Sequence, residues 1–477
     1  MPANYLHGVE TIEVERGPRP VRTVKSAVIG LIGTAPTGAT NKPTLVLSEK
    51  DAAVFGAQLP GFTIPQALDA IYDHGVGTVI VINVFDPAIH KSSVAAEDLK
   101  FDAQTGIAKT TKQGLLTLQL KSADGTTTYA EKTDYTVDLQ SGTLTRVKSG
   151  KISASPATLK VSYDYADPSK VTAADIMGGV NAQGQRTGMK ALKDTYNQFG
   201  CFAKILIAPV YCEQSAVASD MVAVAEQLDA IAYIDAPVGA TFDQVLQGRG
   251  PNGTINFNTS SDRARLCYPR VRVYDPVTNS ERLEPLSTRA AGLRAKVDQD
   301  KGFWWSSSNQ ELAGVIGVER ALSAMIDDPT SEVNMLNEQG ITTVFSSFGS
   351  GFRLWGNRTA AWPTVSHMRN FENVRRTGDV INESIRYFSQ QYIDMPLNQA
   401  TIDALVESVN GYGRKLIGDG ALLGFKAWFD PARNQQTELA AGHLLISYKY
   451  TPPPPMERLS FETEITSEYL LSLKGGN

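Results

Sequence analysis

Short runs of apolar residues alternate with amphipathic stretches through much of the chain. The runs lie at 27–33, 78–84, 202–208 and 230–235. Stretches at 64–74 and 215–228 carry apolar residues at helical spacing. Strands that are apolar throughout are typical of a sheet buried on both faces, and their alternation with helices indicates parallel pairing. The pattern therefore predicts a layered α/β body, which we assign to residues 26–98 and 168–338. Within its second half it predicts one strand at 263–274 and two helices at 287–301 and 309–326.

The segment that divides the body, 99–167, has a different texture. Stretches at 115–120, 135–139 and 159–165 alternate between apolar and polar residues, and turn-forming residues separate them. Helical periodicity is absent, and Ser, Thr and Lys dominate. We therefore predict a small all-β domain that is inserted into the α/β body and faces outward.

The third region, 339–450, is predicted to be an α+β domain. Strands at 341–345 and 352–355 precede a long helix, a second helix around 402–416 and a strand at 427–429. The long helix carries an apolar seam with spacings of three and four residues, formed by Phe371, Val374, Gly378, Ile381, Ile385, Phe388 and Tyr392. A seam of this kind fits a coiled coil or a helix that packs on a sheet, and we favour the second.

Both ends of the chain are predicted to be arms that carry a short strand. In the N-terminal arm, 1–25, Ile12 and Val14 alternate with polar residues before the breaker cluster at 17–20. Near the other end, Leu444, Ile446 and Tyr448 share one face of a strand, and Leu459, Phe461 and Ile465 form a later apolar row in the C-terminal arm, 451–477.

Four prolines at 452–455 separate the last two strands. Such a run prefers polyproline II, at about 3.1 Å per residue, and cannot form a two-residue hairpin turn. A lone strand needs a sheet edge, and another copy of the chain offers one. We therefore predict strand exchange between subunits through these eight apolar residues. The alternative is that each terminal strand docks on its own domain.

Composition and motifs argue against several functions. The 477 residues carry 45 basic and 50 acidic side chains, a net charge of −5, which does not favour nucleic-acid binding. We expect no signal peptide, because the first residues lack a basic and an apolar region, and no membrane helix, because no apolar run reaches the necessary length. The three cysteines and five histidines lack metal-site spacing. Gly30 and Gly33 form an incomplete dinucleotide loop, better explained as a tightly packed strand end. We predict no catalytic, cofactor-binding or metal site; an oligomeric α/β enzyme is the unfavoured alternative.

Basic residues lie off the apolar seam of the long helix and near the end of the next helix. They are Arg375, Arg376, Arg386 and Lys415. A solvated helix face explains them, and so does a basic surface that meets an acidic partner.

The order of several short motifs resembles the contractile tail sheath proteins of tailed bacteriophages and of related phage-tail-like bacteriocins. The motifs lie at 5–10, 17–20, 28–36, 302–306, 351–359 and 371–376. Together with the terminal strands they span nearly the whole chain.

The resemblance implies a structural subunit that stacks as hexameric rings around an inner tube made of a separate tail tube protein. It implies that both arms donate strands to neighbours, and that Arg375, Arg376, Arg386 and Lys415 face acidic tube residues. The sheath would be assembled in the host cytoplasm, meet baseplate and tail terminator proteins at its ends, and contract in the virion to drive the tube through the host envelope for genome ejection. A headless bacteriocin or a secretion machine would use a similar sheath.

Overall fold

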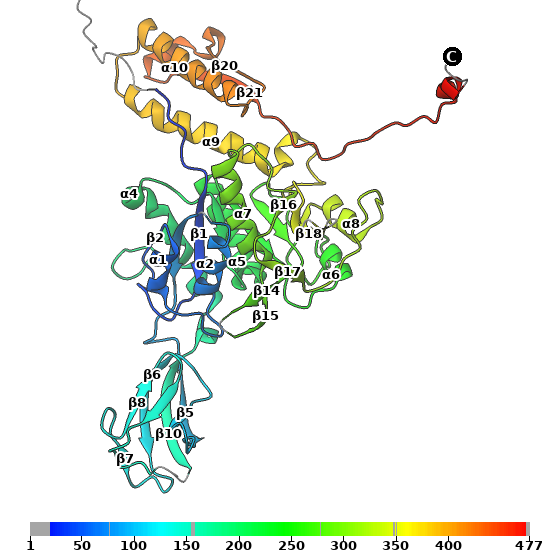
Figure 1. Cartoon of the computed structure of the whole chain (residues 1–477). Helices are drawn as coiled ribbons and strands as arrows, with labels where there is room; N and C mark the ends of the chain where they lie inside the picture. The colour runs from blue at the N-terminus through cyan, green and yellow to red at the C-terminus, as the bar shows by residue number, and fades with distance from the viewer. Residues whose placement is uncertain are drawn as a thin grey trace, which may run out of the picture.

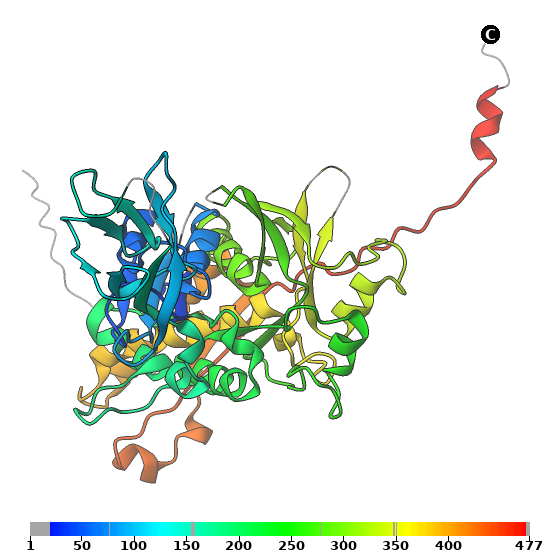
Figure 2. The ribbon, with the colours of Figure 1, turned by 90° about the horizontal axis from the view of Figure 1, so that it is seen from below.

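The computed structural model describes residues 20–473, apart from 76, 154–157, 277, 347, 348 and 350. Figure 1 shows a central α/β body, a small β domain that projects from one end of it, and a C-terminal domain at the opposite end. The last described residues extend away from the molecule in both Figure 1 and Figure 2. The predicted fold class, with α/β and α+β parts and an inserted β domain, is confirmed.

A nine-stranded sheet forms the body, in the order β16-β19-β18-β13-β12-β11-β1-β3-β2. The strands from β18 to β3 run parallel, as predicted, and the edge strands join through antiparallel pairs. The bounds are β1 Val28–Gly33, β2 Thr44–Val46, β3 Thr78–Asn83, β11 Ile205–Ile207, β12 Ile231–Asp235, β13 Ala264–Cys267, β16 Gln310–Glu311, β18 Ile341–Ser346 and β19 Phe352–Trp355.

Alternate residues of the parallel strands pack on opposite faces of this sheet. Val28 and Ile32 of β1 join a core cluster with helix α5 (Ser215–Leu228). Ile29 and Leu31 join the cluster on the other face, which contains α2 (Ile64–Tyr72) and α7 (Leu286–Asp300). Burial on both faces explains why these strands are apolar throughout.

Smaller elements complete the body. Its other helices are α1 Glu49–Ala52, α3 Ala173–Met177, α4 Thr195–Phe199, α6 Phe242–Gln247 and α8 Glu332–Glu338, with 3₁₀ helices at Ala53–Phe55, Pro168–Lys170, Gly188–Asp194, Tyr211–Glu213 and Met368–Asn370. A three-stranded sheet contains β14 (Val271–Asp275), β15 (Ser280–Glu284) and β17 (Val315–Val318).

Two predictions for the second half of the body are wrong. The strand predicted at 263–274 is two strands, β13 and β14, because the chain turns at Tyr268–Pro269 and proline has no N–H to donate to a ladder. The helix predicted at 309–326 is absent; the segment forms β16 and β17 instead. Gly314 lies between them with φ of 71°, a conformation that a helix cannot contain.

The inserted domain is all-β, as predicted, but it begins before residue 99. It has one sheet in the order β4-β10-β6-β7 and another in the order β5-β9-β8 around a shared core. The bounds are β4 Lys91–Leu99, β5 Ile107–Lys109, β6 Leu115–Lys121, β7 Thr128–Tyr129, β8 Tyr135–Asp138, β9 Thr143–Arg146 and β10 Leu159–Ala166. The first strand escaped prediction because exposed and partly exposed residues run along it and only Leu99 is buried, so it carries no apolar row.

The C-terminal domain begins later than predicted, because β18 and β19 belong to the body sheet. It contains α9 (Glu372–Ser389), α10 (Gln399–Gly418), α11 (Gln436–Ala440) and a two-stranded sheet of β20 (Gly424–Phe429) and β21 (Ile446–Thr451). Further 3₁₀ helices lie at Gln390–Tyr392, Pro431–Arg433 and Glu468–Leu473. The apolar seam of α9 packs in one cluster with α10 and with aromatic residues of the sheet, so the helix-on-sheet prediction is confirmed.

Candidate assembly site

Helix α9 has two buried faces. Its apolar seam, including Val380, Ile381 and Phe388, packs within the C-terminal domain. A second row faces the body and is charged: Glu372, Arg376, Asp379 and Glu383, each between 2% and 4% exposed. The spacing of four, three and four residues places them on one side of the helix. We call this row and its partners the ionic seam.

Each charge of this row meets an opposite charge from the body. The carboxylate of Glu372 lies 2.5 Å from the Arg265 guanidinium, Asp379 lies 2.5 Å from Arg263, and Glu383 lies 2.6 Å from the Lys204 ammonium. Arg376 pairs with Asp298 in the last turn of α7. Lys204, Arg263 and Arg265 lie at the starts of β11 and β13, where parallel strands place them on one edge of the sheet.

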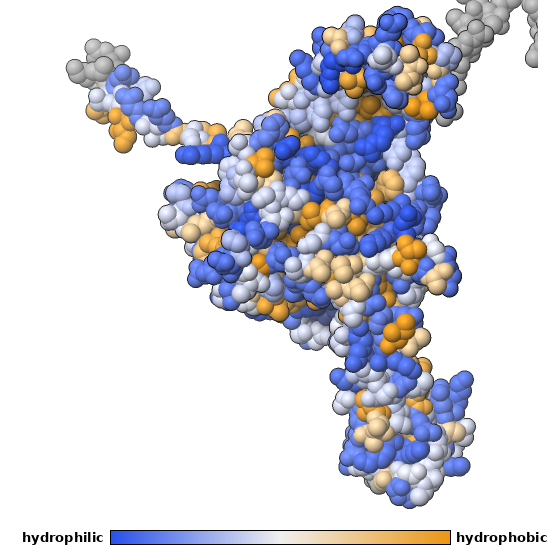
Figure 3. All heavy atoms as spheres, turned by 180° about the vertical axis from the view of Figure 1, so that it is seen from behind, coloured by the Kyte–Doolittle hydropathy of each residue, from blue (hydrophilic) through white to orange (hydrophobic). Residues whose placement is uncertain are grey.

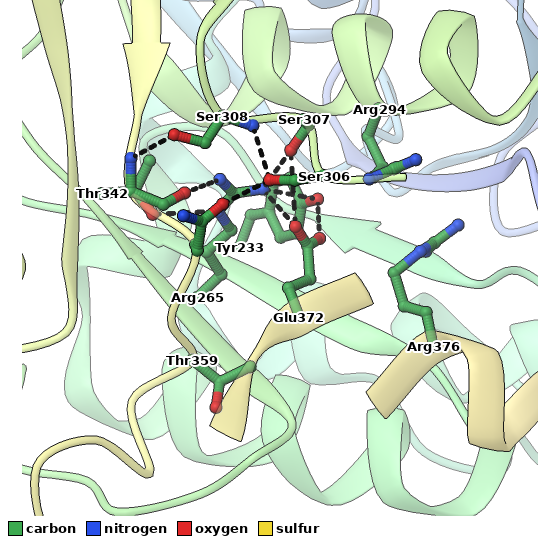
Figure 4. Close-up of polar contacts among 12 residues, drawn as sticks. Tyr233, Arg265, Arg294, Ser306, Ser307, Ser308, Thr342, Thr359, Glu372 and Arg376 are labelled. Atoms are coloured by element: carbon green, nitrogen blue, oxygen red, sulfur yellow. Dashed lines mark hydrogen bonds and ion pairs between the residues drawn. The ribbon is translucent and has the colours of Figure 1, made fainter. Parts of the chain in front are cut away.

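Arg265 is the most enclosed member of the ionic seam, with 0% exposure. Figure 4 shows Arg265, Tyr233 and Ser307 converging on the Glu372 carboxylate. The Arg265 guanidinium also donates to the carbonyl oxygen of Gly356 at 2.8 Å and to the Thr342 hydroxyl at 2.9 Å. A charge with this many partners tolerates burial, whereas an unpaired one would not.

Three of the motifs behind the resemblance meet around this seam. The Ser306 hydroxyl bonds to Asn357, and the Asn373 amide donates to the carbonyl of Trp304 at 2.9 Å. Segments 302–306, 356–359 and 371–376, separate in sequence, are therefore neighbours in space. Their shared role in the fold is to join the C-terminal domain to the body.

Burial and the arginines act in opposite directions on the carboxyl groups. Burial alone raises the pKa of Glu372 and Asp298, but nearby guanidinium groups outweigh it and hold both pKa values below their usual range. For Asp379 burial dominates and its pKa is raised. Glu372 and Asp298 are thus held in the charged form that their partners require.

Arg376 does not face outward, so its predicted role against a tube is wrong. Its side chain is 4% exposed and donates to Asp298 and to the carbonyl oxygen of Ser26 at 3.1 Å. The prediction assumed that positions off the apolar seam are solvated, but the body covers this second face of the helix. The signal in the sequence was the charged row itself, with three acidic residues and one arginine at helical spacing.

The other three predicted basic residues differ in exposure and in partners. Arg375 is 24% exposed and lies between Asp262 and Asp379, at 3.4 Å and 3.2 Å. Arg386 is 62% exposed and contacts Asp229 at 3.1 Å. Lys415 is exposed on α10.

The predicted strand around Ile446 and Tyr448 pairs within its own chain. In β21, Ile446 lies opposite Phe429 and Tyr448 opposite Ala427 of β20. Leu444 precedes the strand and is partly buried. Within the described part of the chain β20 and β21 have no third strand. The Asn410 side chain binds the N–H and the carbonyl of Ala427, so the outer edge of β20 is partly covered, whereas that of β21 is open. Ile446 and Tyr448 therefore belong to a two-stranded sheet that could accept a further strand at the edge of β21.

The terminal arms differ in what the structure describes. Ile12 and Val14 lie outside the described residues. The chain after them crosses α9, where Val21 joins the core of the C-terminal domain and the Val24 N–H donates to the Ser384 hydroxyl at 3.1 Å. At the other end, Leu459, Phe461 and Ile465 are 63%, 82% and 102% exposed. Figure 3 shows apolar atoms uncovered along this arm.

Metal-binding clusters and membrane-spanning helices are both absent from the described residues. No cluster of three His, Cys, Asp or Glu there could hold a metal ion, and no helix in this part is long and apolar enough to cross a membrane. All three cysteines are buried and free.

The chain is similar to phage tail sheath proteins along its whole length. Family models described as the phage tail sheath protein central domain and the phage tail sheath C-terminal domain match residues 184–360 and 364–466. A model described as a protein of unknown function matches residues 87–176. The tail sheath protein of Burkholderia phage BcepMu is 73% identical over 100% of both chains, and that of Escherichia phage P2 is 28% identical over 99% of this chain and 98% of its own.

Solved structures share the fold. The helical sheath of the anti-feeding prophage in its contracted state matches with a TM-score of 0.59 and 17% identity, over 98% of this chain and 100% of that one. The sheath complex of the PVC extracellular contractile injection system, also contracted, matches with a TM-score of 0.59 and 13% identity, over 98% and 99%. With 73% identity to a complete relative, the chain belongs to the phage tail sheath protein family.

Proposed function

We propose that this chain polymerises through its arms, as hexameric rings stacked around a tail tube, and that contraction of the polymer drives the tube through the host envelope for genome ejection. The observation that carries the proposal is the presence, in one chain, of a two-stranded sheet with an open edge at β21 and an uncovered apolar arm. Baseplate and terminator proteins would bind the two ends, and assembly would take place in the host cytoplasm.

The acceptor in this proposal is the sheet of β20 and β21. A two-stranded sheet is marginally stable alone, and among the described residues the outer edge of β21 has no neighbouring strand to pair with its N–H and C=O groups. Strands from neighbouring subunits would satisfy these groups. Leu459, Phe461 and Ile465 fit one donor, and Ile12 and Val14 fit a second. Because donor and acceptor are different surfaces, the contact propagates from subunit to subunit rather than closing a dimer.

The ionic seam supports motion of the subunit as one block. Moving α9 relative to the body would break the four ion pairs of this seam, and any charge left buried without its partner would cost about 3–5 kcal/mol. Contraction would therefore change the packing between blocks, while the arms flex and keep their main-chain bonds. Closer packing of blocks would be favoured by apolar burial, at about 25 cal/mol per Å². No nucleotide hydrolysis is required, and the absence of catalytic activity remains a prediction.

Contact with the tube is proposed for the C-terminal domain, with a narrower set of residues than the sequence suggested. Arg376 is enclosed, and Arg375 and Arg386 already contact carboxylates of their own chain. Lys415 keeps an exposed side chain on α10. Exposed ion pairs contribute about 0–1 kcal/mol each, weak enough to break when the sheath leaves the tube.

The test is electron microscopy of the purified chain and of a variant without residues 458–477. We expect the full chain to form long hollow cylinders with helical striations, since the lattice contacts reside in the chain itself. The variant should stay monomeric with an unchanged thermal unfolding transition, because nearly all of residues 458–470 are exposed. Cylinders formed by the truncated chain would contradict strand donation by the C-terminal arm.

A further inference from the structure

Arg358 lies in the loop between β19 and α9 and has an unusually constrained side chain. Its guanidinium carbon lies 4.1 Å from the centre of the Trp362 ring and 3.8 Å from the centre of the Phe371 ring. One guanidinium nitrogen donates to the Asn370 side-chain oxygen at 2.6 Å. Two aromatic faces and a hydrogen bond hold the group in one orientation, leaving its other edge free to bind a carboxylate.

That edge binds the C-terminal arm. The Arg358 Nε donates to Glu457 Oε1 at 2.9 Å, and Nη2 pairs with Glu457 Oε2, so the contact is bidentate. Four residues earlier, the Pro453 carbonyl accepts a hydrogen bond from the Asn373 amide at 3.4 Å, and Pro452 is buried. The proline run is therefore fastened to the molecule at both ends and is not a free spacer.

Beyond Glu457 the arm is no longer held. Leu459 is 63% exposed and Phe461 82% exposed, and the chain leaves the molecule at this point, as Figure 2 shows. The segment from 458 to 465 reaches about 26 Å when extended, whereas a segment released at Glu457 but still held at Pro453 would run from 454 to 465 and reach about 40 Å. The volume that the arm can explore thus depends on whether Glu457 is bound.

We propose that Arg358 and Glu457 form a clamp that sets the direction in which the C-terminal arm leaves the subunit and confines its bending to residues 458–467. The clamp is a positioning device for assembly, and it rests on the proposed strand donation. A clamped arm presents its apolar row to the neighbouring sheet at a higher effective concentration, because fewer conformations compete with the productive one.

The clamp depends on the chemistry of arginine at position 358 and on partial exposure to solvent. Lysine could supply the charge at position 358 but neither the bidentate contact nor the stacking between two rings. The side chain of Arg358 is 14% exposed and that of Glu457 40% exposed. Added salt should therefore weaken the clamp, because a pair at this depth is only partly shielded from solvent ions.

The test compares the full-length chain with Glu457→Gln and Arg358→Lys variants. The measurement is the critical concentration for polymerisation, from sedimentation of polymer over a protein dilution series. We expect both variants to polymerise with a critical concentration about tenfold higher or more, and Glu457→Gln to keep the wild-type thermal unfolding transition. Lys160→Ala is the matched control: it removes an exposed ion pair with Asp98 in the inserted domain, far from the arm, and should change nothing.

The outcomes distinguish failure of the clamp from failure of the proposed strand donation by the C-terminal arm. If Glu457→Gln polymerises at the wild-type concentration while removal of 458–477 abolishes polymer, strand donation stands and the clamp is rejected. If the truncated chain also polymerises, strand donation itself fails. At high salt the critical concentration of wild type should rise to that of Glu457→Gln, because salt weakens the ion pair that the variant lacks. Such a loss of the difference between the two proteins supports the clamp.

Discussion

At the scale of single residues, burial decides what an ionisable group does. His74 is 4% exposed, with Nδ1 lying 3.2 Å from the Ala70 carbonyl and Nε2 accepting from the Ala313 N–H at 3.3 Å. This pattern requires a neutral imidazole that donates through Nδ1 and accepts through Nε2. Burial lowers the pKa of His74 to about 4, partly opposed by the hydrogen bond to Ala70.

We predict that the chain loses stability as the pH falls from about 6.5 to 4. In this window the unfolded chain binds a proton at His74 and the folded chain does not, so unfolding is favoured by about 3 kcal/mol at the lower end. Urea unfolding of the chain without residues 458–477, at pH 7 and pH 4, measures the effect.

The His74→Gln variant isolates this contribution from other titrating groups. Glu213 has the opposite sign, because burial raises its pKa to about 7 and its cost appears as the pH rises. Glutamine can keep one donor and one acceptor but cannot be protonated, so the variant should lose about 3 kcal/mol less than wild type. Equal losses in both proteins would show that His74 does not carry the effect.

At the scale of elements, α9 joins the two large parts of the molecule. Its apolar seam was predicted from spacing and is confirmed. Its charged row was not predicted, because charged residues of a helix are expected on its solvated face. Here the starts of β11 and β13 supply opposite charges, so the row is buried against the body. The Lys204–Glu383 pair, with both side chains at most 5% exposed, is the simplest pair in which to measure this.

We predict that Glu383→Met destabilises the chain by about 3 kcal/mol, because Lys204 then keeps the Leu228 carbonyl, at 2.8 Å, and the Phe202 ring, 5.9 Å away, but loses its described counter-charge. The double variant Lys204→Met with Glu383→Met should recover most of this loss, because no charge is then buried. Urea unfolding of the single and double variants gives the coupling energy. A double variant less stable than the single one would contradict the explanation by an unpaired charge.

At the scale of the whole molecule, the inserted domain is structurally separate from the body. Its own core holds it together, and every strand of the nine-stranded sheet lies outside it. The two crossing points are adjacent, since the Asp167 N–H donates to the His90 carbonyl at 3.0 Å. Contact with the body core includes the partly buried Leu116.

We predict that replacing residues 91–166 with a short Gly-Ser linker leaves a folded chain that still polymerises. The loss of contacts such as that of Leu116 should cost the body no more than about 2 kcal/mol. Thermal unfolding checks the fold, and electron microscopy checks assembly. A folded variant that forms no cylinders would instead show that the inserted domain takes part in the lattice.

The sequence by itself determined the features that repeat locally. Apolar runs predicted the parallel strands of the body, strict alternation predicted most of the inserted domain, and the seam from Phe371 to Tyr392 predicted α9. Each of these signals is local, because a helix or strand that buries one face repeats apolar residues with its own period. The ordered motifs determined the family.

Only the tertiary structure decided which surfaces meet. It placed β18 and β19 in the body sheet, buried Arg376 against Asp298, paired β21 with β20 and brought Arg358 to Glu457, 99 residues away. Such contacts join residues that are distant in the chain, so they leave no periodic signal. They depend on how already formed elements pack, and packing is settled by the burial and charge of the whole fold rather than of any one segment.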